Sequence, residues 1–197
     1  MKEFFIDSLP ASKGTAMEYN DKIVLKNGQD CIIRNATYED GPEMSELFVL
    51  THSESDYLLS YPEEHILDAK GESEFLQKRA ESDNEVMLVA VVNDRIVATA
   101  GISAVGNKYK VRHRAEFGID VVEEYWGLGI GKAMMKACVQ CAQNAGYQQL
   151  ELEVVAENQR AENMYKSIGF VEYGRNPLGF ISKYSGPQEL VYMRLVL

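Results

Sequence analysis

The sequence predicts a mixed α/β fold in which helices lie on the faces of a central sheet. Three segments predict it: a hairpin pattern at 85–105, a strand at 113–122 that leads through a glycine-rich turn into a helix, and a strand–helix pair at 149–168. Strands interleaved with helices along the chain are typical of this class. The 197 residues are 46% hydrophobic and 25% charged, which is the composition of one folded domain with its own core.

Hydrophobic spacing, capping residues and turn signals place each element. Thr37 and Asp40 have the spacing of a helix-capping pair, and Asn93 with Asp94 is a hairpin signal. Apolar residues recur at helical spacing from Ile130 onwards. In chain order we expect a strand at 31–36, a helix to about 54, a helix at 71–82, the hairpin, a strand at 113–122, a helix at 130–146, a strand at 149–155, a helix at 158–168, and strands near 170–174 and 189–196.

Residues 1–28 are assigned to an N-terminal extension or arm, and residues 29–197 to a single domain. The first segment lacks clear periodicity and ends in the turn signal KNGQD. The remainder contains no internal repeat, low-complexity tract or Pro/Ser-rich linker that would divide it. An arm of this kind could pack on a neighbouring copy, so a homodimer stays open.

The bulk properties exclude some classes of partner. A net charge of −10 argues against a nucleic-acid-binding protein, which needs a basic face, and suits a cationic partner such as an amine. No apolar run approaches the roughly 20 residues of a membrane-spanning helix. The start, MKEFFIDSLP, has an early acidic residue and too short an apolar stretch for a secretory signal. We therefore expect a cytoplasmic protein that is not bound to a membrane.

The cysteines and histidines do not predict a metal site. Cys138 and Cys141 form a C-x-x-C inside a predicted helix, without the second pair that a zinc site needs. We interpret both as small, buried apolar residues. His52, His65 and His113 are scattered and lack the spacing of metal ligands. Catalysis by a metal ion is therefore not expected.

The segment EEYWGLGIGK, residues 123–132, is a glycine-rich turn that opens a helix. Such turns commonly bind phosphates, because glycine lets the backbone approach the ligand and the first N–H groups of the helix are unpaired. A dinucleotide fingerprint fails here, since Lys132, or Met134 in the next frame, takes the place of its third glycine. A P-loop fails because Trp126 replaces its first glycine and Ala133 its Ser or Thr. A diphosphate held by backbone N–H groups is the remaining expectation.

The segments IDVVEEYWGLGIGKAMM and LELEVVAENQRAENMYKSIGF resemble the GNAT-type N-acetyltransferases, which transfer an acetyl group from acetyl-CoA. Their signature has Gln or Arg three residues before one glycine and five before a second glycine or alanine. Gly129 and Gly131 match this signature, whereas Trp126 departs from it. The resemblance covers about residues 31–197 and is strongest over 113–172. It implies a mostly antiparallel sheet of about six or seven strands, with splayed middle strands and about four helices.

The resemblance implies that acetyl-CoA, the acetyl donor, lies between the strands at 113–122 and 149–155. The backbone near 119–121 would pair with the pantetheine arm and polarise the thioester carbonyl, as an oxyanion hole does. Asn158 matches the asparagine that opens the next helix, and Tyr165 the tyrosine that commonly protonates the leaving thiolate. The cofactor-binding residues implied in this way are Ile119, Asp120, Val121, Trp126, Gly127, Leu128, Gly129, Ile130, Gly131, Lys132, Asn158 and Tyr165.

Glu116 is the candidate base that would take a proton from the amine, and Glu153 is a further candidate carboxylate. Strand alternation puts Glu116 and Asp120 on one face of their strand. Counted from the glycine turn, Glu116 is one residue off the usual position of the family's glutamate, so a chain of water molecules is the alternative.

The acceptor pocket is expected in the least regular segments, because loops on a rigid scaffold commonly set specificity. These are 52–64, with Tyr57, Tyr61 and Glu64, and 176–188. Neither segment identifies the acceptor.

The sequence thus predicts an N-acetyltransferase that moves an acetyl group from acetyl-CoA to a primary amine of a small molecule or a peptide. Direct attack in a ternary complex is expected, since no cysteine lies in the motif to form an acetyl-enzyme. The alternative is a non-catalytic acyl-CoA-binding or sensor domain, in which Trp126 and a missing base would mark lost catalysis.

Overall fold

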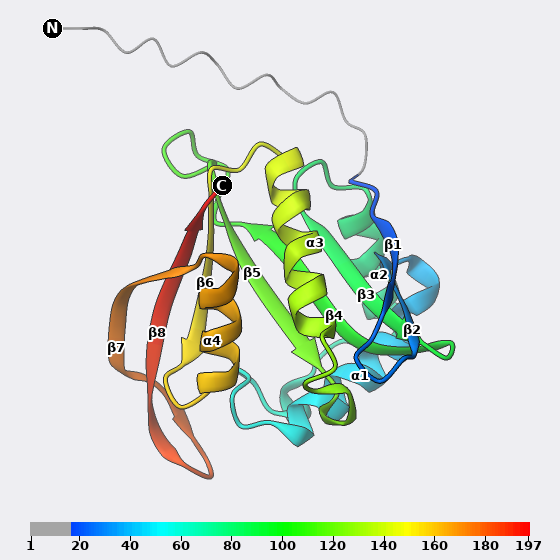
Figure 1. The fold of residues 1–197 in the computed structure, drawn as a ribbon. Helices are drawn as coiled ribbons and strands as arrows, with labels where there is room; N and C mark the ends of the chain where they lie inside the picture. The colour runs from blue at the N-terminus through cyan, green and yellow to red at the C-terminus, as the bar shows by residue number, and fades with distance from the viewer. Residues whose placement is uncertain (1–16) are drawn as a thin grey trace, which may run out of the picture.

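The computed structural model describes residues 17–197, which form an eight-stranded sheet with helices on both faces (Figure 1). The strand order is β1-β2-β3-β4-β5-β6-β8-β7. The strands are β1 Asn20–Val24, β2 Asp30–Asn35, β3 Val86–Val92, β4 Arg95–Ala104, β5 Arg114–Val121, β6 Gln149–Val155, β7 Val171–Ser182 and β8 Gly186–Val196. The helices are α1 Gly41–Glu54, α2 Ala69–Ala80, α3 Ile130–Asn144 and α4 Gln159–Ile168.

The sheet is antiparallel at every strand pair except one, the parallel pair of β5 and β6. α3 and α4 cover one face, and α1 and α2 cover the other (Figure 1). The predicted mixed, mostly antiparallel fold with four helices is confirmed, and the sheet has one strand more than the largest number expected. None of the helices in the described residues is both long and apolar enough to cross a membrane.

The additional strand, β1, lies within the segment assigned to an N-terminal arm. It pairs antiparallel with β2, with Asn20 opposite Arg34 and Val24 opposite Asp30. Four of its five side chains are exposed, so it has no apolar alternation that a sequence pattern could show. The first part of the predicted arm, residues 1–16, lies outside the described residues.

Two local signals in the sequence are confirmed. The Thr37 N–H donates to the Asp40 carboxylate at 2.7 Å just before α1. Asn93 and Asp94 have φ angles of 50° and 60°, as the tight turn between β3 and β4 requires. Both features involve neighbours in sequence, which is why the sequence shows them.

The expectation that 176–188 is irregular is wrong over most of its length. β7 continues to Ser182, and β8 begins at Gly186 after a short turn. The pairing shifts register between Asn176 and Phe180, around Pro177. Proline has no N–H to donate, and it is tolerated here because β7 is an edge strand of the sheet. Pro177 therefore marks an irregularity within a strand.

β5 and β6 pair over only three residues of each strand and then separate, as the predicted splay requires. The Val122 N–H donates to the Val97 carbonyl at 3.0 Å. In an antiparallel strand, every second residue bonds to the same neighbouring strand. Val122 bonds to β4, so Ile119 and Val121, which are an odd number of residues away from it, direct their peptide groups away from β4. They face the gap that β6 has left.

α3 supplies much of the core on its face of the sheet. Ile130, Met134, Cys138 and Cys141 all lie on its buried side. The interpretation of the two cysteines as buried apolar residues is confirmed, and both are free thiols.

α1 and α2 approach closely at Gly41. A Cβ at this position would lie 2.1 Å from the hydroxyl oxygen of Ser73 and 2.5 Å from its backbone nitrogen. Both residues are buried. Only glycine therefore allows the start of α1 to pack against the backbone of α2.

Replacement of this glycine tests the helix packing. We expect Gly41→Ala to lower the free energy of unfolding by about 2 kcal/mol, because the added methyl group meets backbone that cannot rotate away. Gly174→Ala is the control, since its Cβ would meet the nearest atom, in Tyr192, at an ordinary 3.6 Å. Urea denaturation measures both variants, and equal midpoints for the two would contradict the packing described.

Candidate active site

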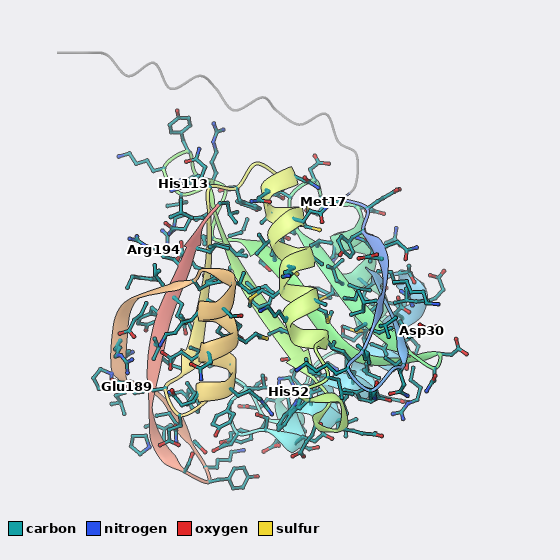
Figure 2. All side chains as sticks on the ribbon, viewed as in Figure 1. Met17, Asp30, His52, His113, Glu189 and Arg194 are labelled. Atoms are coloured by element: carbon teal, nitrogen blue, oxygen red, sulfur yellow. The ribbon has the colours of Figure 1, made fainter. Side chains whose placement is uncertain are left out.

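A cavity of about 950 Å³ lies where β5 and β6 separate. Its walls come from both strands, from the beginnings of α3 and α4, from the end of α1 with residues 55–59, and from β7 and β8. His52, near the end of α1, lines this cavity and is labelled in Figure 2. A cavity of this size accommodates a ligand as large as a cofactor.

The glycine turn, residues 126–132, forms one wall of the cavity. Gly127 and Gly129 have φ angles of 79° and 105°, and a Cβ at either would meet no atom within 4 Å. The left-handed backbone, rather than crowding, therefore requires glycine, and the space beside the turn is open. Gly129 is the N-cap of α3, so the first three N–H groups of this helix have no acceptor within it.

Lys26 holds the outer side of the glycine turn. Its backbone N–H donates to the Leu128 carbonyl at 3.1 Å, and its Nζ donates to the Gly127 carbonyl at 2.9 Å. Leu128 itself does not line the cavity, because its side chain packs against the core. Lys26 belongs to the segment assigned to the arm, and no sequence pattern links it to a turn so distant along the chain.

Trp126 is fixed between the strand and the helix that face the turn. Its indole Nε1 donates to the Val121 carbonyl at 2.6 Å. The guanidinium carbon of Arg160, in the first turn of α4, lies 3.7 Å from the centre of the indole ring. Both side chains line the cavity.

Tyr165 and Asn158 reach the cavity from α4. Tyr165 is buried and contacts Phe117 of β5 edge to face, with ring centres 6.3 Å apart. Burial and the nearby charge of Asp120 raise the pKa of its phenol well above the usual value of 10, so the phenol stays protonated. Asn158 accepts the Ala161 N–H at 3.2 Å and so caps α4.

Unpaired carboxylates line the strand side of the cavity. Glu116, Asp120 and Glu153 have no ion pair or hydrogen bond within residues 17–197, whereas Glu151 binds the guanidinium of Arg114. Burial raises the pKa of Asp120 from 3.8 to about 6. Burial, and then the charge of Glu116, also raises the pKa of Glu153.

The carboxylates and the two helices lie on opposite faces of the sheet at this gap. The side chain of Phe117 points to α4, where it contacts Tyr165. Because side chains alternate along a strand, those of Glu116 and Asp120 point to the opposite face of the sheet. The peptide groups of Asp120 bond to β4, so only its side chain reaches the cavity. The expected shared face of Glu116 and Asp120 is confirmed.

The two segments expected to form an acceptor pocket contact each other. The Ser182 hydroxyl donates to the Asp56 carboxylate at 2.6 Å, and the Ser185 hydroxyl donates to it at the same distance. These bonds join the connection after α1 to the β7–β8 turn. Asp56 is the chain neighbour of Tyr57, so these bonds hold a cavity-lining segment against the β7–β8 turn.

Of the three residues expected in the first of these segments, only Tyr57 lines the cavity. The Tyr61 hydroxyl accepts the Lys183 N–H at 2.7 Å, and Glu64 accepts the Tyr61 N–H at 2.8 Å. Tyr61 and Glu64 therefore shape the connecting segment from outside the cavity.

The charged side chains of the cavity are separated by sign. The cations are Lys26, Lys132 and Arg160, at the glycine turn and the beginning of α4. The carboxylates are on β5 and β6. Of the predicted site residues, Leu128 of the glycine turn and Tyr61 and Glu64 of the first acceptor segment do not line this cavity. The lining residues that sequence reasoning missed include Lys26, Arg160 and Tyr173, whereas His52 and Phe180 lie in the segments expected to form the acceptor pocket.

The model of the Acetyltransferase (GNAT) family matches residues 45–170. A GNAT-family acetyltransferase from Streptococcus pneumoniae is 27% identical, with a TM-score of 0.81 over 85% of this chain and 99% of that chain. yncA, a putative acetyltransferase from Salmonella typhimurium solved with its cofactor acetyl-CoA, is 17% identical, with a TM-score of 0.75 over 85% and 94% of the two chains. The ribosomal-protein-alanine N-acetyltransferase of Brucella melitensis is 23% identical, with a TM-score of 0.73 over 84% and 99%. No curated protein matches this chain.

The family match covers more than half of the chain. It includes β5, the glycine turn, β6 and α4, which form a large part of the cavity wall, whereas β7 and β8 lie outside the matched residues. Enzymes of this family transfer acetyl groups, with acetyl-CoA as the donor. The chain therefore belongs to the GNAT family of acetyltransferases.

Proposed function

We propose that the protein transfers an acetyl group from acetyl-CoA to a primary amine by direct attack, with donor and acceptor bound together. The observation that carries the proposal is the cavity at the β5–β6 gap, where cations lie at the glycine turn and carboxylates lie on the strands. The first side suits the phosphates of the donor, and the second suits a protonated amine. The separation of charge allows both ligands to bind at once.

The residues around the glycine turn fit acetyl-CoA. The open space beside Gly127 and the free N–H groups at the start of α3 suit a diphosphate. The peptide groups of Ile119 face the gap, where an extended arm can pair in place of β6. When bound, acetyl-CoA supplies the thioester carbonyl that the amine attacks. The Ile119 N–H would stabilise negative charge on the carbonyl oxygen.

The positions of the cysteines support direct attack. Cys31, Cys138 and Cys141 are buried, and none of them lines the cavity. Burial raises the pKa of Cys138, and it raises that of Cys141 to about 11. Both thiols are therefore protonated and poorly nucleophilic at neutral pH.

Asp120 is the carboxylate best suited to accept the proton of the amine. It has no partner among the described residues, it faces the cavity, and its pKa of about 6 lies close to neutral pH. At pH 7 it is ionised and ready to accept a proton. Glu116, the candidate from the sequence, is exposed and lies beside Glu153, where it can attract a cationic acceptor.

Tyr165 is suited to give a proton to the departing thiolate. Its raised pKa keeps the proton on Oη until a strong base forms nearby. Its contact with Phe117 fixes the ring at the edge of the gap.

The walls on the carboxylate side support an aliphatic, positively charged acceptor. Tyr57, Tyr173 and Phe180 line this region together with Leu59 and Leu190. Aromatic faces and carboxylates both stabilise ammonium groups, and the leucines suit a methylene chain.

The function is tested by the release of CoA thiol from acetyl-CoA in the presence of primary amines, with the acetylated product identified by mass spectrometry. We expect release that depends on the amine. Binding of acetyl-CoA without release would favour the acyl-CoA-binding alternative, and the absence of binding would contradict the proposal.

Replacement of Tyr165 by Phe tests the proton donor. We expect kcat to fall by about 10²-fold, with little change in the KM for acetyl-CoA, because the ring is kept and only the hydroxyl is lost. Tyr109→Phe, at an exposed tyrosine outside the cavity, is the control. Steady-state kinetics gives both values, and an unchanged kcat would remove Tyr165 from the mechanism.

Replacement of Asp120 by Asn tests the base and has a stability consequence. Folding raises the pKa of Asp120, so its ionised form destabilises the folded state; this penalty is absent below pH 3.8 and complete above about pH 6. We therefore expect Asp120→Asn to raise Tm at pH 7.5 by more than at pH 4.5, while kcat falls.

Calorimetry at the two pH values measures the change in stability, and the kinetics of Glu116→Gln provide the comparison. A larger loss of kcat in Glu116→Gln than in Asp120→Asn would return the role of base to Glu116.

Replacement of Glu153 by Gln tests the charge of the acceptor. We expect 1,4-diaminobutane to have a higher kcat/KM than 4-aminobutanoate, which has a carboxylate in place of one amine. Glu153→Gln should reduce this ratio by about fivefold, because one attracting charge is lost. Glu46→Gln, at an exposed position of α1 outside the cavity, should keep the ratio. The same ratio in both variants would show that Glu153 does not select the acceptor.

A further inference from the structure

Trp126 replaces a polar or cationic side chain in the phosphate-binding turn. The family signature has Gln or Arg at this position, so position 126 itself offers no side chain that could donate hydrogen bonds to an anion. Trp126 is also the single tryptophan of the chain. Its indole N–H already donates to the Val121 carbonyl, so it is not free for a ligand.

Arg160 brings a positive charge to the same place from another element. Its guanidinium lies over the indole of Trp126, at 3.7 Å from the ring centre, and it has no ion pair in residues 17–197. The ring is held in turn by the bond to Val121. A stacked guanidinium keeps its N–H groups at its edge, where they can bind an anion.

We propose that Arg160, stacked on Trp126, binds a phosphate group of acetyl-CoA and replaces the side chain that the turn has lost. This inference rests on the proposed function. Arg160 is better placed than Lys26, whose Nζ already donates to the Gly127 carbonyl. The indole lies against the plane of the Arg160 guanidinium, and a planar guanidinium can bind two phosphate oxygens at once.

The test compares the affinities of wild type and Arg160→Ala for three donors: acetyl-CoA, 3′-dephospho-acetyl-CoA and S-acetylpantetheine. Calorimetric titration gives Kd, and the emission of Trp126 reports on the same site directly. We expect Arg160→Ala to weaken acetyl-CoA binding by about tenfold, the loss of one charge-assisted contact. S-acetylpantetheine, which has no phosphate, should bind both proteins equally.

The 3′-dephospho donor identifies the phosphate group. A loss that persists with it assigns Arg160 to the diphosphate, and a loss that disappears assigns it to the 3′-phosphate. An equal loss with S-acetylpantetheine would overturn the proposal, because Arg160 would then act only on the shape of the site. Equal acetyl-CoA affinities of wild type and variant would also overturn it.

Three further variants keep the test independent of folding. Arg160→Lys preserves the charge without the planar fork and should bind acetyl-CoA with intermediate affinity. Arg95→Ala removes an exposed arginine outside the cavity and should bind as wild type does. Trp126→Arg in the Arg160→Ala background should recover affinity, since it restores the residue of the family signature. Failure of wild type itself to bind acetyl-CoA would instead refute the proposed function.

Discussion

β5 and β6 are parallel neighbours for three residues only, and the position of every part of the site follows from their separation beyond that point. Separation leaves the peptide groups of Ile119 and Val121 without a strand partner. It also opens the sheet between its two faces, so the helix N-termini reach the gap from one face and the carboxylates from the other. A sheet that continued its ladder would have neither the cavity nor the free backbone groups.

The site carries features that oppose stability, and the surrounding core offsets them. An ionised Asp120 without a partner costs free energy because it is buried, and Gly127 and Gly129 cost free energy because glycine loses more conformational freedom on folding than other residues do. They lie beside a fully buried layer from β3, β4 and α3 that includes Leu88, Ile102 and Met134. Glu116, Asp120 and Glu153 have no arginine partner in residues 17–197. Unpaired carboxylates in a cavity indicate that the site is arranged to bind a ligand rather than to stabilise the fold.

The sequence could predict the features that depend on near neighbours in the chain. The turn at Asn93 and the glycine turn with its helix are of this kind, and so is the position of Tyr165 on α4. Lys26 and Arg160 could not be predicted at the turn, because only the folded sheet brings them there. The role proposed for Asp120 depends on which of its groups β4 uses and on how deeply its carboxylate lies, and neither is visible in a strand pattern.

A crystal structure of the protein with CoA tests the central claim most directly, which is that the β5–β6 gap is the donor site. The structure predicts the diphosphate against the first N–H groups of α3, and the pantetheine arm between the two strands with a hydrogen bond to the Ile119 backbone. CoA bound outside the gap, or a gap closed by continued β5–β6 pairing when CoA is bound, would contradict it.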